Sequence, residues 1–281
     1  MFEGTHTALV TPFRDGKIDW QAYRDLIESQ IAAGITGLVP VGTTGESPTL
    51  THDEHAEVIR VAVETVAKRC LVIAGAGSNS TAEAISLTEE AEKLGADALL
   101  HVAPYYNKPS QEGLYQHYRA IAHHTSLPVV LYSIPGRCGI EIAIETVARL
   151  AADCPNVRAI KEAGGTVERV SQLRVALPES CEILSGDDSM TVAFMSVGGV
   201  GVISVASNLL PKPVLAMVRA SLEGDVAAAK TAHLQLYTLF KALLSVGPNP
   251  APIKYCLEQA GICSGELRLP LVPVDQAGGE K

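Results

Sequence analysis

The chain has 281 residues, of which 47% are hydrophobic and 19% charged, a composition typical of a globular protein with a sizeable core. Its formal net charge is -9 and no Lys/Arg cluster interrupts the acidic balance, which argues against nucleic acid and anionic membrane surfaces as partners. No stretch reaches the roughly 20 apolar residues that span a bilayer, and the first residues lack a signal-peptide pattern. We therefore expect a cytoplasmic protein.

The six cysteines lie far apart and no two form a C-x-x-C pair, which argues against a zinc site and against a redox motif. In a reducing compartment they are expected to be small core residues. Cys138, next to Arg137 in a Gly-rich turn, is the one candidate for a reactive thiol, and the structural interpretation is favoured over it.

Short apolar segments of strand length alternate with segments of helical periodicity over the first 206 residues. Segments 19–34, 52–69 and 81–95 illustrate the helical spacing. Eight such alternations predict parallel strands with helical crossovers, and at this length a closed (β/α)8 TIM barrel is favoured over an open sheet. The predicted strands are residues 5–10, 36–41, 70–75, 97–102, 128–133, 157–161, 182–185 and 200–204.

The strand pattern stops after residue 206. Segments 209–225, 226–244 and 249–261 have helical periodicity, which predicts a C-terminal helical appendage over residues 207–281. No low-complexity linker separates this region from the barrel, so we expect the two to pack against each other.

Polar residues follow several of the predicted strands. In a barrel of this kind the reacting groups come from the C-terminal ends of the strands and the loops after them. The polar positions are residues 42–46 (GTTGE), 104–107 (PYYN), 132–137 (YSIPGR), 161 (Lys) and 186–188 (GDD).

Lys161 stands near the end of an otherwise apolar strand. Alternation places Val157 and Ala159 on its face and turns Glu162 away. It is either a solvated lysine at a strand end, the commoner case, or a desolvated amine that forms a Schiff base with a ketone. Keeping an ordinary lysine neutral at pH 7 costs roughly 4 to 5 kcal/mol, which an apolar barrel interior largely offsets.

Three neighbouring positions have both a chemical and a structural interpretation. The pair Thr43-Thr44, between glycines, can present hydroxyl and N–H groups to a carboxylate, or form a plain tight turn. Tyr132 can carry a proton during imine formation, or be a half-buried aromatic residue. Arg137 offers a planar fork to a second carboxylate, or is a solvated loop arginine.

Six motifs together resemble dihydrodipicolinate synthases, within the N-acetylneuraminate lyase superfamily. The likeness runs from residue 4 to residue 275. The motifs are GTTGE (42–46), PYYNKPSQEGLYQHY (104–118), LYSIPGRCG (131–139), IKEAGG (160–165), SGDD (185–188) and GVISV (201–205).

The resemblance implies a reaction for Lys161. Lys161 would form an imine with pyruvate, and Thr43, Tyr132 and Tyr106 would relay protons, with Tyr106 supplied across a subunit interface. The resulting enamine would attack aspartate β-semialdehyde, and ring closure would release Lys161. The implied product is 4-hydroxy-tetrahydrodipicolinate, a precursor of diaminopimelate and lysine.

The resemblance also implies how the substrates are held. Thr44 would bind the pyruvate carboxylate and Arg137 the carboxylate of the semialdehyde, while the backbone near Gly186 and Ile203 would line the pocket. No metal and no dissociable cofactor is called for. The alternatives are a pyruvate-dependent sugar-acid aldolase of the same superfamily and a non-catalytic barrel that senses an amino acid; YSIPGR disfavours the first, and the set of Lys161, Tyr132 and Thr43 the second.

A second site follows from the same resemblance, a pocket in which lysine acts as a feedback inhibitor. The competing interpretation is structural, because residues 51–54 also fit a helix capping box. The residues that match the pocket are Ser47, Pro48, His52, His55, Asn79, Glu83 and Tyr105.

The sequence departs from the family pattern at three places. Ser133 stands where Asn is usual and Cys138 where Thr is usual, which puts fine positioning in the site in question. The chain ends at residues 276–281, where relatives continue into a last helix. We expect a homodimer or homotetramer, with the tetramer in question for this reason.

Overall fold

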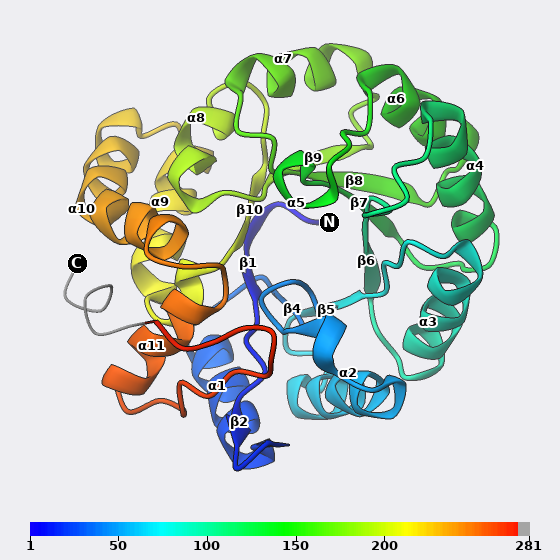
Figure 1. The fold of residues 1–281 in the computed structure, drawn as a ribbon. Helices are drawn as coiled ribbons and strands as arrows, with labels where there is room; N and C mark the ends of the chain where they lie inside the picture. The colour runs from blue at the N-terminus through cyan, green and yellow to red at the C-terminus, as the bar shows by residue number, and fades with distance from the viewer. Residues whose placement is uncertain (275–281) are drawn as a thin grey trace.

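In the computed structural model, which describes residues 1–274, eight parallel strands close into a barrel (Figure 1). The barrel closes because β1 pairs with both β4 and β10. Each strand overlaps a predicted one, so the predicted fold class is confirmed. The barrel strands are β1 (Gly4–Ala8), β4 (Gly37–Val39), β5 (Leu71–Gly75), β6 (Ala98–Val102), β7 (Val129–Ser133), β8 (Val157–Glu162), β9 (Glu182–Ser185) and β10 (Gly201–Ser204).

Helices surround the barrel (Figure 1). Their ends follow local signals: the Asp19 side chain caps the start of α1, and Gly34 ends it with a φ of 89° that suits glycine. The helices are α1 (Trp20–Ala33), α2 (His52–Val66), α3 (Thr81–Lys93), α4 (Gln111–Ala122), α5 (Pro135–Cys138), α6 (Ile144–Asp153), α7 (Val167–Ala176), α8 (Thr191–Met195), α9 (Pro211–Leu222), α10 (Val226–Ser245) and α11 (Ala251–Gln259).

Some short elements were not predicted. A two-stranded hairpin, β2 (Phe13–Arg14) and β3 (Lys17–Ile18), precedes α1, and 3-10 turns occupy Ser47–Thr49, Asp188–Met190 and Ala206–Asn208. Segments of two or three residues are too short to show a hydrophobic period, so the sequence pattern does not reveal them.

The barrel interior and the layer between barrel and helices are separate apolar clusters. The interior cluster includes Ala8, Val39, Ala159 and Ile203, and Phe2 fills it just before β1 begins. Because these side chains exclude water, a polar group at the end of a strand in this interior is desolvated.

The strand that carries Lys161 contains an irregularity. The register between β7 and β8 shifts where Val129 and Val130 pair with Val157 and Ala159. Val157 consequently packs in the outer layer, whereas Ala159 packs in the interior. The prediction that Val157 shares a face with Lys161 was wrong. It assumed strict alternation of side chains along the strand, and the irregularity at the start of β8 interrupts that alternation.

The predicted C-terminal helices are observed as α9, α10 and α11. α9 packs against β1 and α1, and α10 packs along α9, so the region after residue 206 lies against the barrel as expected. The division at residue 206 stays a prediction. Residues 276–281, whose ending put the tetramer in question, lie outside the described residues.

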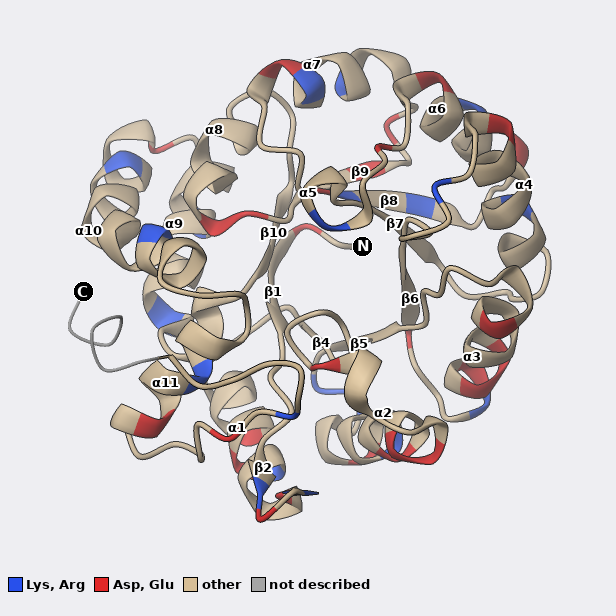
Figure 2. Ribbon diagram, in the orientation of Figure 1, with Lys and Arg blue, Asp and Glu red and all other residues tan. Residues whose placement is uncertain are grey.

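Charged residues are interspersed over the outer helices in Figure 2, with blue and red side by side on α4, α6 and α7. A blue segment also lies on β8, in the wall of the barrel. Within residues 1–274, no helix combines the length and the hydropathy that crossing a bilayer requires.

Candidate active site

A cavity of about 490 Å³ opens at the C-terminal ends of the strands. This is the end of a (β/α)8 barrel where reacting groups gather. Six of the residues predicted to act on substrate line it: Thr43, Thr44, Tyr132, Arg137, Lys161 and Gly186.

Lys161 is buried, with 6% of its surface exposed. Its Nζ lies 4.2 Å from the centre of the Tyr132 ring, on the neighbouring strand. Among residues 1–274 no carboxylate pairs with this Nζ and no hydrogen bond leaves it. Burial lowers the pKa of Lys161 to about 7, with the Asp188 charge opposing and Arg137 reinforcing the change. A large fraction of this amine is therefore neutral at physiological pH.

Gly186 leaves room for the lysine. A Cβ at this position would lie 3.0 Å from Lys161 Cε and 2.8 Å from Ala163 Cβ. Any larger residue at position 186 would displace Ala163 or the end of the Lys161 side chain, so the Gly-Asp-Asp turn has a steric role beside this lysine.

Tyr132 is a protonated phenol in this site. Burial raises its pKa to about 12, and the Arg137 charge and the nearby Thr43 side chain counter part of that effect. The predicted proximity of Lys161, Tyr132 and Thr43 is therefore present in the structure, while their roles stay a prediction.

Thr44 and Arg137 are linked by a residue that the sequence did not single out. Asn249 Nδ2 donates to Thr44 Oγ1 at 3.0 Å, and Arg137 Nη2 donates to the Asn249 carbonyl at 3.5 Å. Asn249 and Leu244 come from the C-terminal helical region and line the cavity. No periodic or motif signal marks Asn249, because its contacts are with residues more than a hundred positions away.

Of the two departures from the family pattern near this site, Cys138 lines the cavity and Ser133, next to Tyr132, does not. Burial raises the pKa of the Cys138 thiol to about 11, so the residue is a thiol and not a thiolate nucleophile. Ser133 is fully buried, and its hydroxyl has no hydrogen-bond partner within the described part of the chain.

Tyr106 and Ile203 are placed apart from the cavity. Tyr106 is 89% exposed and has a φ of 70°, which is uncommon for a residue with a side chain. Ile203 is buried in the interior cluster that also contains the lining residues Ala8 and Val39, and is not itself among the lining residues.

The predicted lysine site borders the same cavity. His52 Nε2 lies 3.0 Å from Glu83 Oε1, and a hydrogen bond from Ser78 is the main cause that lowers the pKa of Glu83. Asn79 is outside the lining and donates to the Tyr105 carbonyl at 3.2 Å. The lining members of the set are Ser47, Pro48, His52, His55, Glu83 and Tyr105.

The competing interpretation of residues 51–54, a helix capping box, is also confirmed. Thr51 and Glu54 form a complete capping box at the start of α2, which puts His52 in the first helical turn. Burial lowers the pKa of His55. Within residues 1–274, no group of three or more His, Cys, Asp or Glu is arranged to hold a metal ion.

Fold and site together define a (β/α)8 barrel enzyme whose cavity, at the C-terminal ends of the strands, contains a buried lysine with a lowered pKa. The whole chain, residues 1–281, matches the model of the dihydrodipicolinate synthetase family. The chain belongs to this family.

Individual relatives agree with this assignment. The 4-hydroxy-tetrahydrodipicolinate synthase of Chelativorans sp. (strain BNC1) is 54% identical over 282 residues, which cover 100% of this chain and 96% of the relative. The structure of the synthase from Methylacidiphilum fumariolicum SolV has a TM-score of 0.98 and 55% identity, covering 100% of this chain and 93% of that one. The structure of the dihydrodipicolinate synthase from Cyanidioschyzon merolae with lysine bound has a TM-score of 0.96 and 42% identity. The match covers 99% of this chain and 95% of that one.

The chain is thus a lyase that condenses pyruvate with L-aspartate 4-semialdehyde to 4-hydroxy-tetrahydrodipicolinate, a step of diaminopimelate and lysine biosynthesis.

Proposed function

We propose that Lys161 carries this reaction as the imine-forming residue. The observation that supports it is the buried Nζ, which has no carboxylate partner and a pKa lowered to about 7. The neutral amine adds to the keto carbon of pyruvate and water leaves, which gives the imine. Loss of a methyl proton gives the enamine, whose carbon attacks the aldehyde. The amine of the second substrate then attacks the imine carbon and expels Lys161, so no dissociable cofactor is needed.

Tyr132 and Thr43 are assigned to proton transfer. The Tyr132 ring lies 4.2 Å from the amine and the Thr43 side chain is near the phenol, so the phenol would donate to the departing water and accept a proton later. Tyr106 is assigned to the same relay from a second subunit. Its exposed side chain and left-handed backbone fit a residue that projects into a neighbouring copy.

Thr44 and Arg137 are assigned to the two carboxylates. Thr44 lies in the Gly-rich turn beside the cavity and would bind pyruvate, while the exposed guanidinium of Arg137 at the mouth would bind the semialdehyde. Asn249 contacts both residues and would keep the two subsites in register. Gly186 leaves space for the amine, and Ile203 supports the floor of the site.

Borohydride reduction in the presence of pyruvate tests the proposal. We expect a covalent adduct on Lys161 in the wild type and none in Lys161→Ala. Absence of an adduct on wild-type Lys161 would contradict the assignment of Lys161 as the imine-forming residue. A coupled assay that compares aspartate semialdehyde with N-acetylneuraminate separates the synthase from a sugar-acid aldolase.

We also propose that the protein is a homodimer or homotetramer, that it is located in the cytoplasm, and that lysine inhibits it. Tyr106 supports the oligomer, and the His52–Glu83 pair beside the cavity supports a site for a cationic amino acid. Analytical ultracentrifugation of wild type and Tyr106→Ala tests the first. Loss of lysine inhibition in Glu83→Gln with unchanged kcat tests the second, and equal inhibition of both proteins would contradict it.

A further inference from the structure

The loop of residues 42–46, which carries Thr43 and Thr44, is strained where it begins and where it ends. Val41 has a φ of 49° and Glu46 a φ of 55°, a left-handed conformation that costs a residue with a side chain on the order of 1–3 kcal/mol. The loop also packs closely, since a Cβ on Gly45 would lie 3.0 Å from the Val41 nitrogen. Such a loop keeps its shape only where surrounding groups fix it.

The Glu46 side chain is held by the C-terminal region. Its carboxylate is buried and pairs with Lys254 Nζ of α11, and both side chains have no exposed surface. The other carboxylate oxygen accepts a hydrogen bond of 3.1 Å from the Arg268 backbone N–H. Lys254 also donates to the Glu266 carbonyl at 2.9 Å. These charge-assisted bonds fix the carboxylate from two directions.

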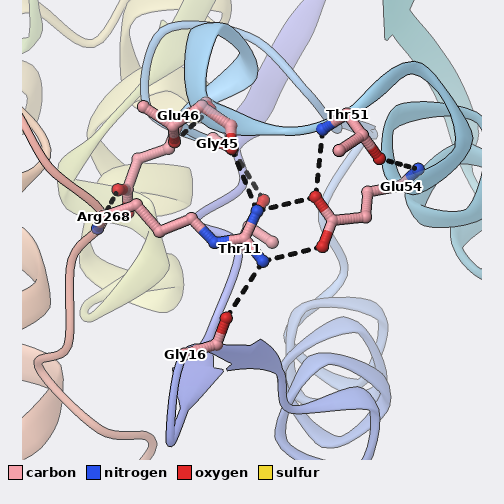
Figure 3. Close-up of polar contacts among 8 residues, drawn as sticks. Thr11, Gly16, Gly45, Glu46, Thr51, Glu54 and Arg268 are labelled. Carbon is pink, nitrogen blue, oxygen red and sulfur yellow. Dashed lines mark hydrogen bonds and ion pairs between the residues drawn. The ribbon is translucent and has the colours of Figure 1, made fainter.

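Arg268 ties the same C-terminal segment to the start of α2 (Figure 3). Its guanidinium donates to both oxygens of Glu54, at 2.6 and 2.7 Å, and to the carbonyls of Thr49 at 3.0 Å and Gly16 at 3.1 Å. Glu54 is the residue that closes the capping box with Thr51. In Figure 1 the red C-terminal segment runs from α11 toward this region.

The contacts to Glu46 and to Glu54 lie on either side of the 3-10 turn Ser47–Thr49, which follows the loop. Asn249, which donates to Thr44, precedes the helix that carries Lys254. The C-terminal region therefore contacts the loop through the Thr44 hydroxyl and the Glu46 carboxylate. A buried ion pair is by itself weak evidence of stabilisation, because replacing both partners with apolar residues often leaves stability unchanged. The position of the Glu46–Lys254 pair, next to the loop that carries Thr43 and Thr44, therefore matters more than its energy.

We infer that Glu46, held by Lys254 and by the segment around Arg268, is a positioning residue that sets the 42–46 loop for pyruvate. It touches no reacting atom and acts through Thr43 and Thr44. The inference rests on the proposed function, in which these threonines meet pyruvate.

The first test is Arg268→Gln, compared with Arg69→Gln as a matched control. Arg69 makes the same two-bond contact with Glu28, but beyond the opposite end of α2 and away from the cavity. The readout is the pyruvate concentration that gives half-maximal borohydride trapping on Lys161, measured by intact mass, with the melting temperature recorded in parallel.

We expect Arg268→Gln to raise the half-saturating pyruvate concentration about fivefold to tenfold, corresponding to about 1 to 1.4 kcal/mol, while trapping at saturation is retained. Arg268→Lys should recover part of the loss, because it keeps the charge but not the two-bond fork. Arg69→Gln should leave pyruvate saturation as in the wild type. A purely structural role would lower the melting temperature of both variants and change the pyruvate dependence of neither.

The second test is the double variant Glu46→Gln/Lys254→Met, which removes both charges and leaves no unpaired buried charge. We expect its half-saturating pyruvate concentration to rise by about tenfold or more, with Lys161 still trapped at high pyruvate. Wild-type pyruvate saturation in both Arg268→Gln and the double variant would overturn the inference. Failure of wild-type Lys161 to trap pyruvate would instead overturn the proposed function, so the two failures are distinguishable.

Discussion

Two buried lysines lie at the same end of the barrel and differ in their partners. Lys161 is buried beside the Tyr132 ring, and no carboxylate of residues 1–274 forms a salt bridge with it. Lys254 lies over the Phe13 ring at 4.2 Å, pairs with Glu46, and donates to the Glu266 carbonyl at 2.9 Å. Burial lowers the pKa of both amines, and a carboxylate opposes that effect at each, Asp188 at Lys161 and the directly paired Glu46 at Lys254.

The comparison shows that burial alone does not give a lysine its role. An aromatic ring lies near each Nζ, so the ring does not distinguish them. A direct ion pair does: Glu46 pairs with Lys254 and stabilises its ammonium form, whereas Lys161 feels the Asp188 charge without a salt bridge, and its amine loses the proton near pH 7. We propose that this difference makes Lys254 a structural charge and Lys161 a nucleophile. Four predictions test this difference, from the largest expected effect to the smallest.

Lys161→Met should abolish imine formation and lower kcat/KM by roughly ten-thousandfold or more, because no other lysine of residues 1–274 lines the cavity. Lys254→Met should still trap pyruvate on Lys161. Steady-state kinetics and intact mass after borohydride check both variants. Trapped pyruvate on Lys254 in the Lys161→Met protein would show that the two lysines are interchangeable.

Lys254→Met should lower the free energy of unfolding by about 3 to 5 kcal/mol, because it leaves the Glu46 carboxylate buried and unpaired. Adding Glu46→Gln should recover most of this loss. Urea denaturation at pH 7 measures both. A single variant as stable as the wild type would mean that the pair is not desolvated as the structure indicates.

Lys161→Met should have the opposite effect on stability and raise the free energy of unfolding. The pKa of Lys161 is about 7 in the folded chain against 10.5 for an ordinary lysine, so folding disfavours the charged form. The cost is complete below pH 7, shrinks as the pH rises from 7 to 10.5 and then disappears, so stability should gain up to roughly 4 kcal/mol at pH 6 and little at pH 10. Urea titrations at both pH values check the sign, and a larger gain at pH 10 would refute it.

Asp188→Asn should shift the pH dependence of imine formation. The Asp188 charge raises the pKa of Lys161, so its removal should move the midpoint of trapping at limiting pyruvate lower by about one pH unit. The backbone N–H groups of Val205 and Ala206, which now donate to Asp188, find an amide oxygen in the variant. An unchanged or higher midpoint would indicate that Asp188 does not act on this amine.

Local patterns in the sequence were sufficient to predict the barrel. Alternation of apolar strands with helical periods located all eight strands, and the polar ends of those strands located Lys161, Tyr132 and Thr44. The failure at Val157 has a local cause, a register shift that a period of two does not anticipate.

The contacts of the C-terminal region were beyond this approach. Asn249, Lys254 and Arg268 meet the site across about two hundred residues of sequence, and each has an ordinary local interpretation as a loop or helix residue. Lys254 in particular lies in a segment of helical periodicity, where a lysine is usually solvated. Only the folded arrangement shows that its amine is buried against Glu46.

The most direct test of this account is the titration of the two amines by NMR of the protein carrying ¹³C-labelled lysine. The account predicts that the Lys161 signal, assigned by its loss in Lys161→Met, titrates with a midpoint near pH 7. A midpoint close to the ordinary lysine value of 10.5 would contradict it, because the amine would then be charged when pyruvate arrives.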